Sequence, residues 1–306
     1  MRAEGFIGTL FAQMKVSVFT FLRNGAKLGY PFLESIRSAL PLADEYVVAL
    51  GPSDPEEQDQ TRQSLLSLNE TKLRIVDSVW NEGMRVAGFV YGQQKMLAQS
   101  QCNGDWAFYL EADEVLHEND LDKIHDSMQR HLTRSAVEAL VFDYVHFFGS
   151  PQWQAVSPGW YRRAPRIIRN TIRTVACDGL FWNVVVNNQK MRWPRAALTG
   201  ANVYHYGHVR PISAMHAKQQ SVERYWNKTP QDFSRYQIDP SAVRPYSSNH
   251  PSVMRDWLAE RADDAWQPNP EYRPTSRERR HRLVMKVERT LGVDLSRKHF
   301  KLVSHD

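Results

Sequence analysis

Cysteine is scarce in this sequence, and long apolar runs are absent. Cys102 and Cys177 are the two cysteines among 306 residues, and neither belongs to a CxxC pair or lies beside a cluster of histidines. A disulfide framework and a structural zinc site are therefore not expected. No apolar run approaches the roughly 20 residues that a membrane-spanning helix needs, so the sequence predicts no transmembrane segment.

Charge of one sign does not dominate either. Lysine and arginine number 39 against 34 aspartates and glutamates, a formal excess of +5. So small an excess gives no reason to expect a nucleic-acid partner, and it suits equally a protein that handles phosphates or lies near anionic lipid. The first 14 residues lack a convincing cleavage site for a signal peptide. We therefore expect a cytoplasmic protein, with peripheral contact at the inner face of a membrane as an open alternative.

The first 116 residues do contain a regular alternation of strand-like and helical patterns. Apolar runs predict strands at 15–21, 46–50, 73–76 and 106–110, and helical spacing predicts helices at 30–40, 65–68 and 93–100. Such alternation favours a parallel, Rossmann-like sheet whose ligands bind beyond the carboxyl ends of its strands. Polar residues follow three of these strands, so a binding site is expected at that edge.

The remainder of the chain changes character. Residues 137–148 predict a further strand, residues 151–210 a mixed or antiparallel region, and residues 254–262 and 276–291 two helices. The division that follows is an N-terminal extension (1–14), a main domain (15–249) and a helical C-terminal extension (250–306).

Three carboxylates follow the predicted strand at 106–110, in the stretch WAFYLEADEVL. Like charges at the end of a buried strand repel one another and resist desolvation, and Mg²⁺ or Mn²⁺ is the simplest group that offsets this cost. Side chains two residues apart on an extended segment point the same way, so Glu111 and Asp113 are expected to share one ion or its water shell. Glu114 is expected to face elsewhere and to fix an arginine or lysine. The alternative is that the acids mark a turn before a helix cap.

Several stretches resemble family 2 glycosyltransferases, enzymes that have the GT-A fold. GDWAFYLEADEVL resembles their strand and metal motif, VSVFTFLRNG their first strand and nucleotide loop, and EYVVALGPSD with the later DQT their second strand and its loop. HFFGS, WYRRAPRIIRN and VYHYGHVR resemble a bacterial subgroup, and HPSVM at 250–254 is similar as well. The resemblance covers about residues 15–210. Glu111 stands where the motif usually has aspartate, and Leu50-Gly51 where many members have a base-reading aspartate.

The resemblance implies a GT-A fold, which is a Rossmann-like mixed sheet flanked by helices, and an inverting, metal-dependent sugar transfer. The nucleotide-sugar donor is expected to bind to residues 15–116, and a glycan or lipid-linked acceptor to residues 117–249. Mg²⁺ or Mn²⁺ is the expected cofactor, and surface polysaccharide biosynthesis the expected context. A sugar nucleotidyltransferase and a non-catalytic nucleotide- or glycan-binding relative are the alternatives. The single glycine in FLRNGAK speaks against the first of these, since nucleotidyltransferases usually have a glycine-rich loop there.

Individual roles follow from the same resemblance and from side-chain chemistry. The expected metal ligands are Asp113, Glu111 and His205. The residues expected to bind the donor are Thr20, Arg23, Asn24, Asp54, Glu111, Arg166, Arg169 and His205. Of the four arginines between 162 and 169, only one or two are expected to reach the site, because a strand points its side chains to both faces.

Two further expectations concern the acceptor side and the C-terminal extension. Asp178 is the expected general base that takes the proton of the acceptor hydroxyl, and Asp143 is the competing candidate. The basic run from Arg277 to Arg282 either attracts anionic lipid headgroups or lies on a solvated helix face.

Overall fold

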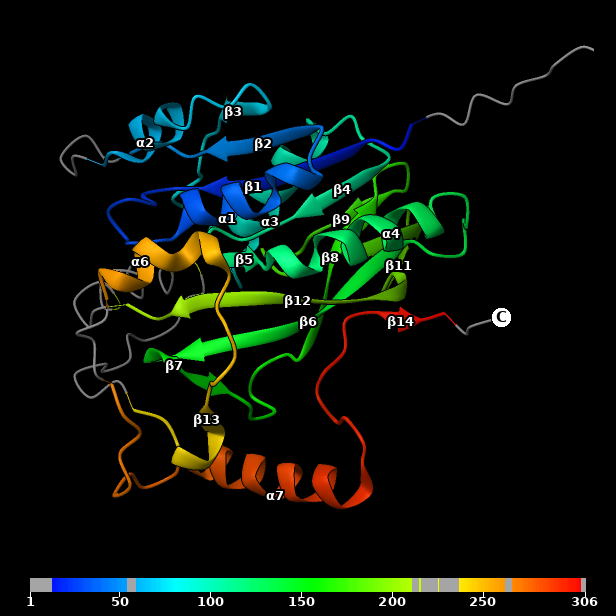
Figure 1. The fold of residues 1–306 in the computed structure, drawn as a ribbon. Helices are drawn as coiled ribbons and strands as arrows, with labels where there is room; N and C mark the ends of the chain where they lie inside the picture. Colours follow the sequence, from blue (N-terminus) through cyan, green and yellow to red (C-terminus); the bar gives the residue numbers. More distant parts are fainter. Residues whose placement is uncertain are drawn as a thin grey trace, which may run out of the picture.

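The computed structural model describes residues 13–53, 59–210, 215, 225, 237–261 and 266–303. In this part of the chain, eleven strands form one mixed sheet, and helices lie against both of its faces (Figure 1). The strand order along the main path is β13-β7-β6-β8-β4-β1-β2-β3. The prediction of a mixed α/β sheet flanked by helices is thereby confirmed.

The N-terminal half of the sheet is parallel, as the alternating pattern predicted. It consists of β1 (Val16–Leu22), β2 (Glu45–Leu50), β3 (Leu73–Asp77) and β4 (Trp106–Tyr109), in the spatial order β3-β2-β1-β4. The helices that connect these strands are α1 (Phe32–Ala39), α2 (Thr61–Ser67) and α3 (Phe89–Ser100), with a short 3-10 turn η1 (Leu40–Leu42) after α1. Because the four strands run in one direction, their carboxyl ends lie at one edge of the sheet.

The second half of the sheet is mixed, which also agrees with the prediction. β8 (Arg163–Arg169) pairs antiparallel with β4 and with β6 (Ala139–Phe148), and the sheet continues through β7 (Ser150–Ala155) to β13 (Val243–Pro245). The long strand β12 (Arg195–His208) runs parallel to β6 and also pairs with β5 (Glu114–Leu116) and β14 (Lys301–Leu302). Thus β12 joins the acidic stretch after β4 to the rest of the molecule.

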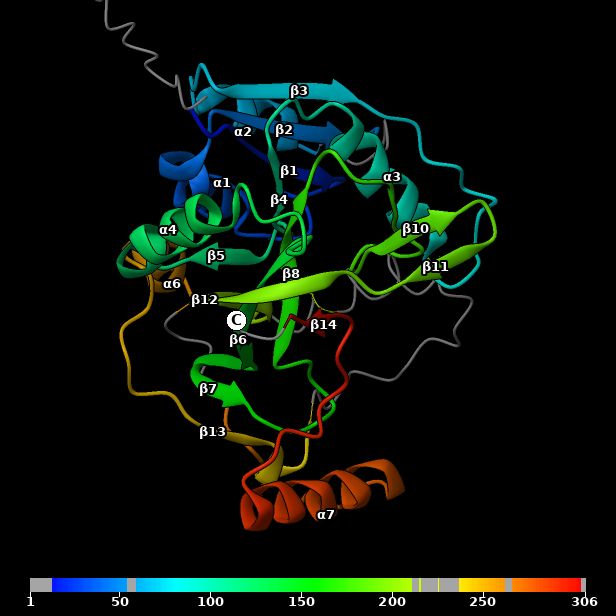
Figure 2. The same cartoon turned by 90° about the vertical axis from the view of Figure 1, so that its right-hand side faces the viewer.

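Alternating side chains of the central strands fill two apolar clusters on opposite faces. On β4, Trp106 and Phe108 belong to the cluster beneath α1 and α4 (Leu121–His131), whereas Ala107 and Tyr109 belong to the cluster beneath α3. Figure 2 shows α1 and α4 on one side of the sheet and α3 on the other. Burial of each large apolar side chain contributes about 1.5–3 kcal/mol, so the strand that leads to the acids is firmly held.

The smaller elements complete the described chain. A separate three-stranded sheet contains β9 (Thr174–Val175), β10 (Asn183–Asn187) and β11 (Lys190–Arg192), and it projects from the main body (Figure 2). The 3-10 turns η2 (Glu118–Asp120), η3 (Pro240–Ala242) and η4 (Ser252–Met254) and the short helix α6 (Arg255–Ala259) lie in the connections. No helix among the described residues is both long and apolar enough to span a membrane.

The helix α7 (Ser276–Leu291) has the bounds that the sequence predicted. Thr275 and Glu278 form a capping box at its start, and Gly292 with φ 63° ends it in the left-handed conformation that favours glycine. The predicted helix at 254–262 is shorter, because it is divided into η4 and α6. The chain beyond α7 is not only helical, since β14 returns to pair with the start of β12.

Candidate functional site

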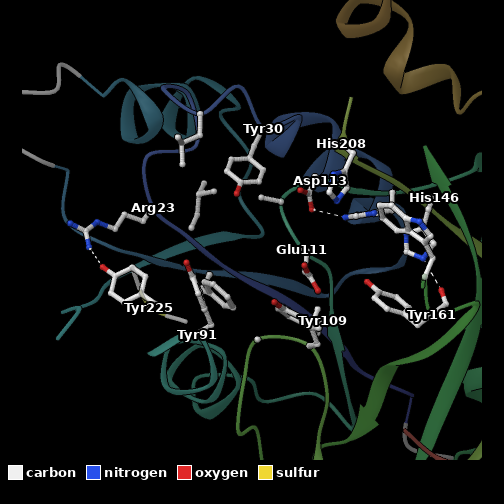
Figure 3. Close-up of a pocket in the computed structure, with 18 of the residues that line it drawn as sticks. Arg23, Tyr30, Tyr91, Tyr109, Glu111, Asp113, His146, Tyr161, His208 and Tyr225 are labelled. Atoms are coloured by element: carbon white, nitrogen blue, oxygen red, sulfur yellow. Dashed lines mark hydrogen bonds and ion pairs between the residues drawn. The ribbon is translucent and has the colours of Figure 1, made fainter. Parts of the chain in front are cut away.

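A pocket of about 340 Å³ lies at the carboxyl ends of β1 and β4, the edge at which the sequence placed the site. Figure 3 shows Arg23 and Tyr225 at one end and His146 and Tyr161 at the other, with Asp113 between them. The walls are mainly aromatic, while the acids that follow β4 supply charge. An apolar pocket with a few convergent polar groups is the usual form of a small-molecule site.

Asp113 is buried and lies between an arginine and a histidine. Its Oδ2 accepts a hydrogen bond from Arg210 Nη2 at 3.0 Å, and its Oδ1 lies 3.6 Å from His205 Nε2. A Cβ on Gly207 would lie 2.5 Å from His205 Nε2 and 2.9 Å from Asp113 Oδ2. Glycine at this position therefore preserves the approach of the two side chains. Arg210 was not among the predicted site residues, although it ends the stretch VYHYGHVR.

The orientation of His205 is set by a second histidine, His146, which the sequence did not single out. His146 Nε2 lies 2.7 Å from the carbonyl oxygen of Tyr161, and its Nδ1 lies 2.9 Å from His205 Nδ1. Because a carbonyl only accepts, Nε2 of His146 must carry a proton. Burial lowers the pKa of His146 well below its usual range, so its Nδ1 accepts from Nδ1–H of His205. Nε2 of His205 then faces the Asp113 carboxylate.

Glu114 and Arg166 form a buried ion pair beneath the pocket. Arg166 Nη2 and Nε lie 2.5 Å and 2.8 Å from the two carboxylate oxygens of Glu114, and the Tyr144 hydroxyl donates to the same carboxylate at 2.7 Å. Both charged side chains are 0% exposed. The prediction that Glu114 faces away from the ion site and fixes an arginine is confirmed.

Glu111 does not point the same way as Asp113, which corrects the expectation drawn from an extended segment. The chain turns at 112–113, with the amide of Glu114 bonded to the carbonyl of Glu111 at 3.0 Å. Glu111 Oε1 instead accepts from Arg166 Nη2 at 2.7 Å. Burial and the neighbouring Glu114 carboxylate raise the pKa of Glu111 to about 8.

The described residues contain no group of three or more His, Cys, Asp or Glu side chains that would hold a metal ion. Two side chains of types that can bind a metal nevertheless lie together, the Asp113 carboxylate and the imidazole of His205. The Asp113 Oδ1 and His205 Nε2 atoms lie 3.6 Å apart, so one cation between them could contact both. A carboxylate with an imidazole fits Mn²⁺, and a diphosphate commonly supplies the remaining ligands of such ions.

The four residues after or within β1 and β2 that were expected to bind the donor have different surroundings. Arg23 lines the pocket and donates from Nη1 to the Tyr225 hydroxyl at 2.9 Å. Asn24 follows it in a left-handed conformation, with φ 53°. Thr20 is buried within β1, where its hydroxyl donates to the carbonyl of Phe21 at 3.4 Å. Asp54 lies outside the described residues.

An aromatic wall near Arg23 was missed at the sequence level. Phe21, Trp80, Tyr91 and Tyr225 lie in mutual ring contact, with neighbouring centroids 5.5 to 6.1 Å apart. Trp80 follows β3, so its position after a parallel strand was a usable signal. Tyr225 lies far along the chain, and no local pattern marks it.

The four arginines between 162 and 169 separate as the strand geometry predicted. Arg166 alone contacts the acids of the pocket, while Arg162 binds Glu288 and Arg163 binds Asp143. Arg169 does not reach the pocket, which corrects its assignment to the donor. Since β8 is antiparallel to β4, Arg169 lies opposite Trp106, at the amino end of β4. There it donates to the carbonyls of His131 and Leu132.

Asp178 lines a second cavity, which shares Tyr161 and Leu180 with the first pocket. Its Oδ1 accepts from the amides of Leu180 and Phe181, so the carboxylate is held within its own turn. The competing candidate, Asp143 on β6, pairs with Arg163 and is not part of the pocket lining.

The buried side chain of Lys95, which was also not predicted from the sequence, holds the turn at 178–181 in place. Lys95 Nζ donates to the carbonyl of Leu180 at 3.0 Å and lies 3.6 Å from the centre of the Trp182 ring. Arg166 donates to the same carbonyl at 2.9 Å. Burial, together with the neighbouring Arg166 charge, lowers the pKa of Lys95 well below its usual range. The turn at 178–181 is thus attached to both α3 and β8.

The chain was compared with family models, curated sequences and solved structures. No family model matches the chain, and no curated protein sequence matches it. Its structure is similar to that of S. aureus TarS, with a TM-score of 0.39 and 17% identity over 68% of this chain and 39% of that one. It is also similar to glucosyl-3-phosphoglycerate synthase from Mycobacterium tuberculosis, with a TM-score of 0.31 and 17% identity over 45% of this chain and 46% of that one. This chain therefore matches less than half the length of either protein.

Proposed function

We propose that this protein is a glycosyltransferase with the GT-A fold, which moves a sugar from a nucleotide-sugar donor to a glycan or lipid-linked acceptor. The observation that carries the proposal is the pocket at the carboxyl ends of β1 and β4, in which Asp113 and His205 face each other. The resemblance of residues 15–210 to family 2 enzymes supports it independently. A role in surface polysaccharide biosynthesis with inversion at the anomeric carbon is part of the same proposal.

In this proposal the nucleotide occupies the end of the pocket near Arg23. The rings of Trp80, Tyr91 and Tyr225 offer flat apolar faces to a base and its ribose. Arg23 and Asn24 follow β1 at the same edge and supply polar groups. The aromatic wall favours a planar ring, and none of its residues is a carboxylate that could read the base. Asp54 is a candidate for that carboxylate.

Asp113 and His205 would hold Mg²⁺ or Mn²⁺ against the donor diphosphate. The bound ion would supply positive charge that stabilises the leaving diphosphate. His146 keeps Nε2 of His205 directed at Asp113. Arg210 and Arg166 position Asp113 and Glu111, and they add positive charge beneath the site.

Asp178 is the proposed general base. Its carboxylate would take the proton of the acceptor hydroxyl as that oxygen bonds to the anomeric carbon and the nucleoside diphosphate leaves. The support for this role is its place beside Leu180, which lines the pocket and the adjoining cavity alike.

The proposal extends to peripheral contact with an anionic membrane, made by α7. Its outward face carries Leu283, Val287 and Leu291, which are 64%, 37% and 65% exposed. The helix has six basic residues against two glutamates, and its opposite face is attached to the protein through Glu288 and Arg162. An apolar stripe flanked by basic side chains is typical of helices that lie in a lipid interface. A second copy of this chain would set like charges face to face, so an anionic lipid surface is the better partner.

The test is donor binding and turnover by the wild type and by Asp113→Asn. We expect one of UDP, GDP, CDP or dTDP to bind in calorimetry, more tightly with Mn²⁺, and the variant to lose sugar transfer by at least about 100-fold because the proposed ion would lose its carboxylate. Asp143→Asn is the matched control, since Asp143 lies on the sheet outside the pocket. Thermal denaturation checks that both variants are folded. Unchanged donor turnover by Asp113→Asn, or no binding of any of the four nucleotides, would contradict the proposal.

A further inference from the structure

A second cavity, of about 430 Å³, lies directly beside the donor pocket. Tyr161 and Leu180 line both, so the two spaces share a wall. Asp178 lines the second cavity, and its Oδ2 has no hydrogen-bond or ion-pair partner among the described residues. A molecule in this cavity would therefore lie beside both the proposed base and the donor.

Two cationic side chains line the same cavity. Arg277 comes from the first turn of α7 and Arg297 from the segment after it, and both are exposed. Within the described chain, neither guanidinium has a hydrogen bond or an ion pair to a protein group. Other arginines nearby are paired: Arg282 binds Asp239 at 2.6 Å, and Arg162 binds Glu288 at 2.8 Å. Two unpaired guanidinium groups at one cavity create a local attraction for an anion.

Two aromatic side chains, His299 and Trp193, also line this cavity. His299 lines it and is only 7% exposed, with its ring stacked on Phe181 at 3.6 Å between centroids. Its Nδ1 is buried and lacks a hydrogen-bond partner among the described residues. Trp193, half-exposed at 37%, meets His299 edge-on and adds an aromatic face.

We propose that this cavity is the acceptor subsite and that it takes a sugar carrying an acidic group, a carboxylate or a phosphate. The acidic group would bind Arg277 and Arg297, and the apolar face of the sugar ring would lie on Trp193. The acceptor hydroxyl would point to Asp178, beside the wall shared with the donor pocket. This inference rests on the proposed function, since the reaction it serves is sugar transfer. In that step the hydroxyl oxygen bonds to the anomeric carbon, its proton goes to Asp178, and the bond from that carbon to the diphosphate breaks.

The test compares three small probes that differ in charge: glucose, glucuronate and glucose 6-phosphate. Dissociation constants from ligand-detected NMR should be at least about tenfold lower for one or both acidic sugars than for glucose, because a charge-assisted hydrogen bond contributes about 1.5–3 kcal/mol. The double variant Arg277→Gln/Arg297→Gln should remove that preference and leave glucose binding unchanged. Preference for glucuronate identifies a carboxylate, and preference for glucose 6-phosphate a phosphate.

The matched control is Arg280→Gln, an exposed arginine on the same helix that is outside the cavity lining. It should keep the preference for acidic sugars. Equal binding of all three sugars by the wild type, or an undiminished preference in the double variant, would overturn the inference.

The failure of this inference can be told apart from failure of the proposed function. Nucleotide binding and slow donor hydrolysis depend on the first pocket, so the double variant should retain both. Nucleotide turnover without any preference for acidic sugars would refute only the acceptor class. A preference for acidic sugars in a protein that binds no nucleotide would refute the glycosyltransferase proposal while leaving an anionic sugar site.

Discussion

At the residue scale, Glu114 and Arg166 form an ion pair in which both side chains are completely buried. Their cost of desolvation is offset by two hydrogen bonds from Arg166 to Glu114 and by one from the Tyr144 hydroxyl to Glu114. Removing one member of such a pair leaves the other unpaired in a medium that stabilises charge poorly. The pair therefore holds Glu111 and the turn that leads to Asp113 in position.

The first prediction concerns Arg166→Met. We expect the free energy of unfolding to fall by about 3–5 kcal/mol, since Glu114 would remain as an unpaired buried carboxylate. Arg163→Met is the control, because its pair with Asp143 is partly exposed and contributes only about 0–1 kcal/mol. Urea denaturation of the two variants measures the difference, and equal losses would contradict the interpretation.

The sequence was sufficient for those site residues that depend on local pattern, and insufficient for those that depend on strand pairing. Asp113 follows an apolar strand, and that alone indicated its edge of the sheet. Arg166 and Arg169 lie in the same short basic stretch, and the sequence alone does not distinguish them. The antiparallel register of β8 puts Arg166 at the carboxyl end of β4 and Arg169 at the amino end. Lys95 reaches the site from a helix whose burial could not be read from spacing.

At the element scale, α7 combines a capped start, a glycine stop and an apolar stripe on the face turned away from the protein. Its bounds were predictable because the capping box and the terminal glycine are local signals. Its exposed stripe was not predictable, since periodicity does not tell which face of a helix packs. The basic run from Arg277 to Arg282 first suggested lipid contact. Part of it has another role, because Arg282 pairs with Asp239.

The prediction at this scale is that α7 binds lipid. Leu283→Ser/Leu291→Ser should reduce sedimentation with phosphatidylglycerol vesicles by at least about tenfold, because each buried leucine contributes about 1.5–3 kcal/mol. Leu66→Ser on α2 removes an equally exposed leucine, at 63%, and should have no effect. Binding of the wild type should weaken in high salt. Sedimentation that is the same for the double variant and the wild type would contradict the role of the stripe.

At the scale of the whole molecule, the sheet continues across the predicted halves without interruption. Glu138, just before β6, accepts from Arg192 and Arg195, and these bonds join the β11–β12 corner to the centre of the sheet. Burial alone would raise the pKa of Glu138, but these hydrogen bonds outweigh it and lower the pKa to about 2. Its charge thus contributes to global stability.

The sign of the pH dependence follows from that lowered pKa. The stabilisation is fully present above the unfolded value of 4.5 and is lost as pH falls toward 2. Glu138→Gln should be less stable than the wild type by on the order of 2 kcal/mol at pH 7, and this gap should shrink between pH 4.5 and 2. Urea denaturation at several pH values measures it. A gap that stays constant over this range would show that the charge of Glu138 is not responsible.

The pairing of β13 with β7 and of β14 with β12 fixes the chain on both sides of α7. A segment attached at both ends has less freedom to move than one attached at a single end. Arg277 and Arg297 both lie between these two attachment points. A single cut in the backbone of α7 would leave each fragment bound through its own strand, so the molecule would remain in one piece.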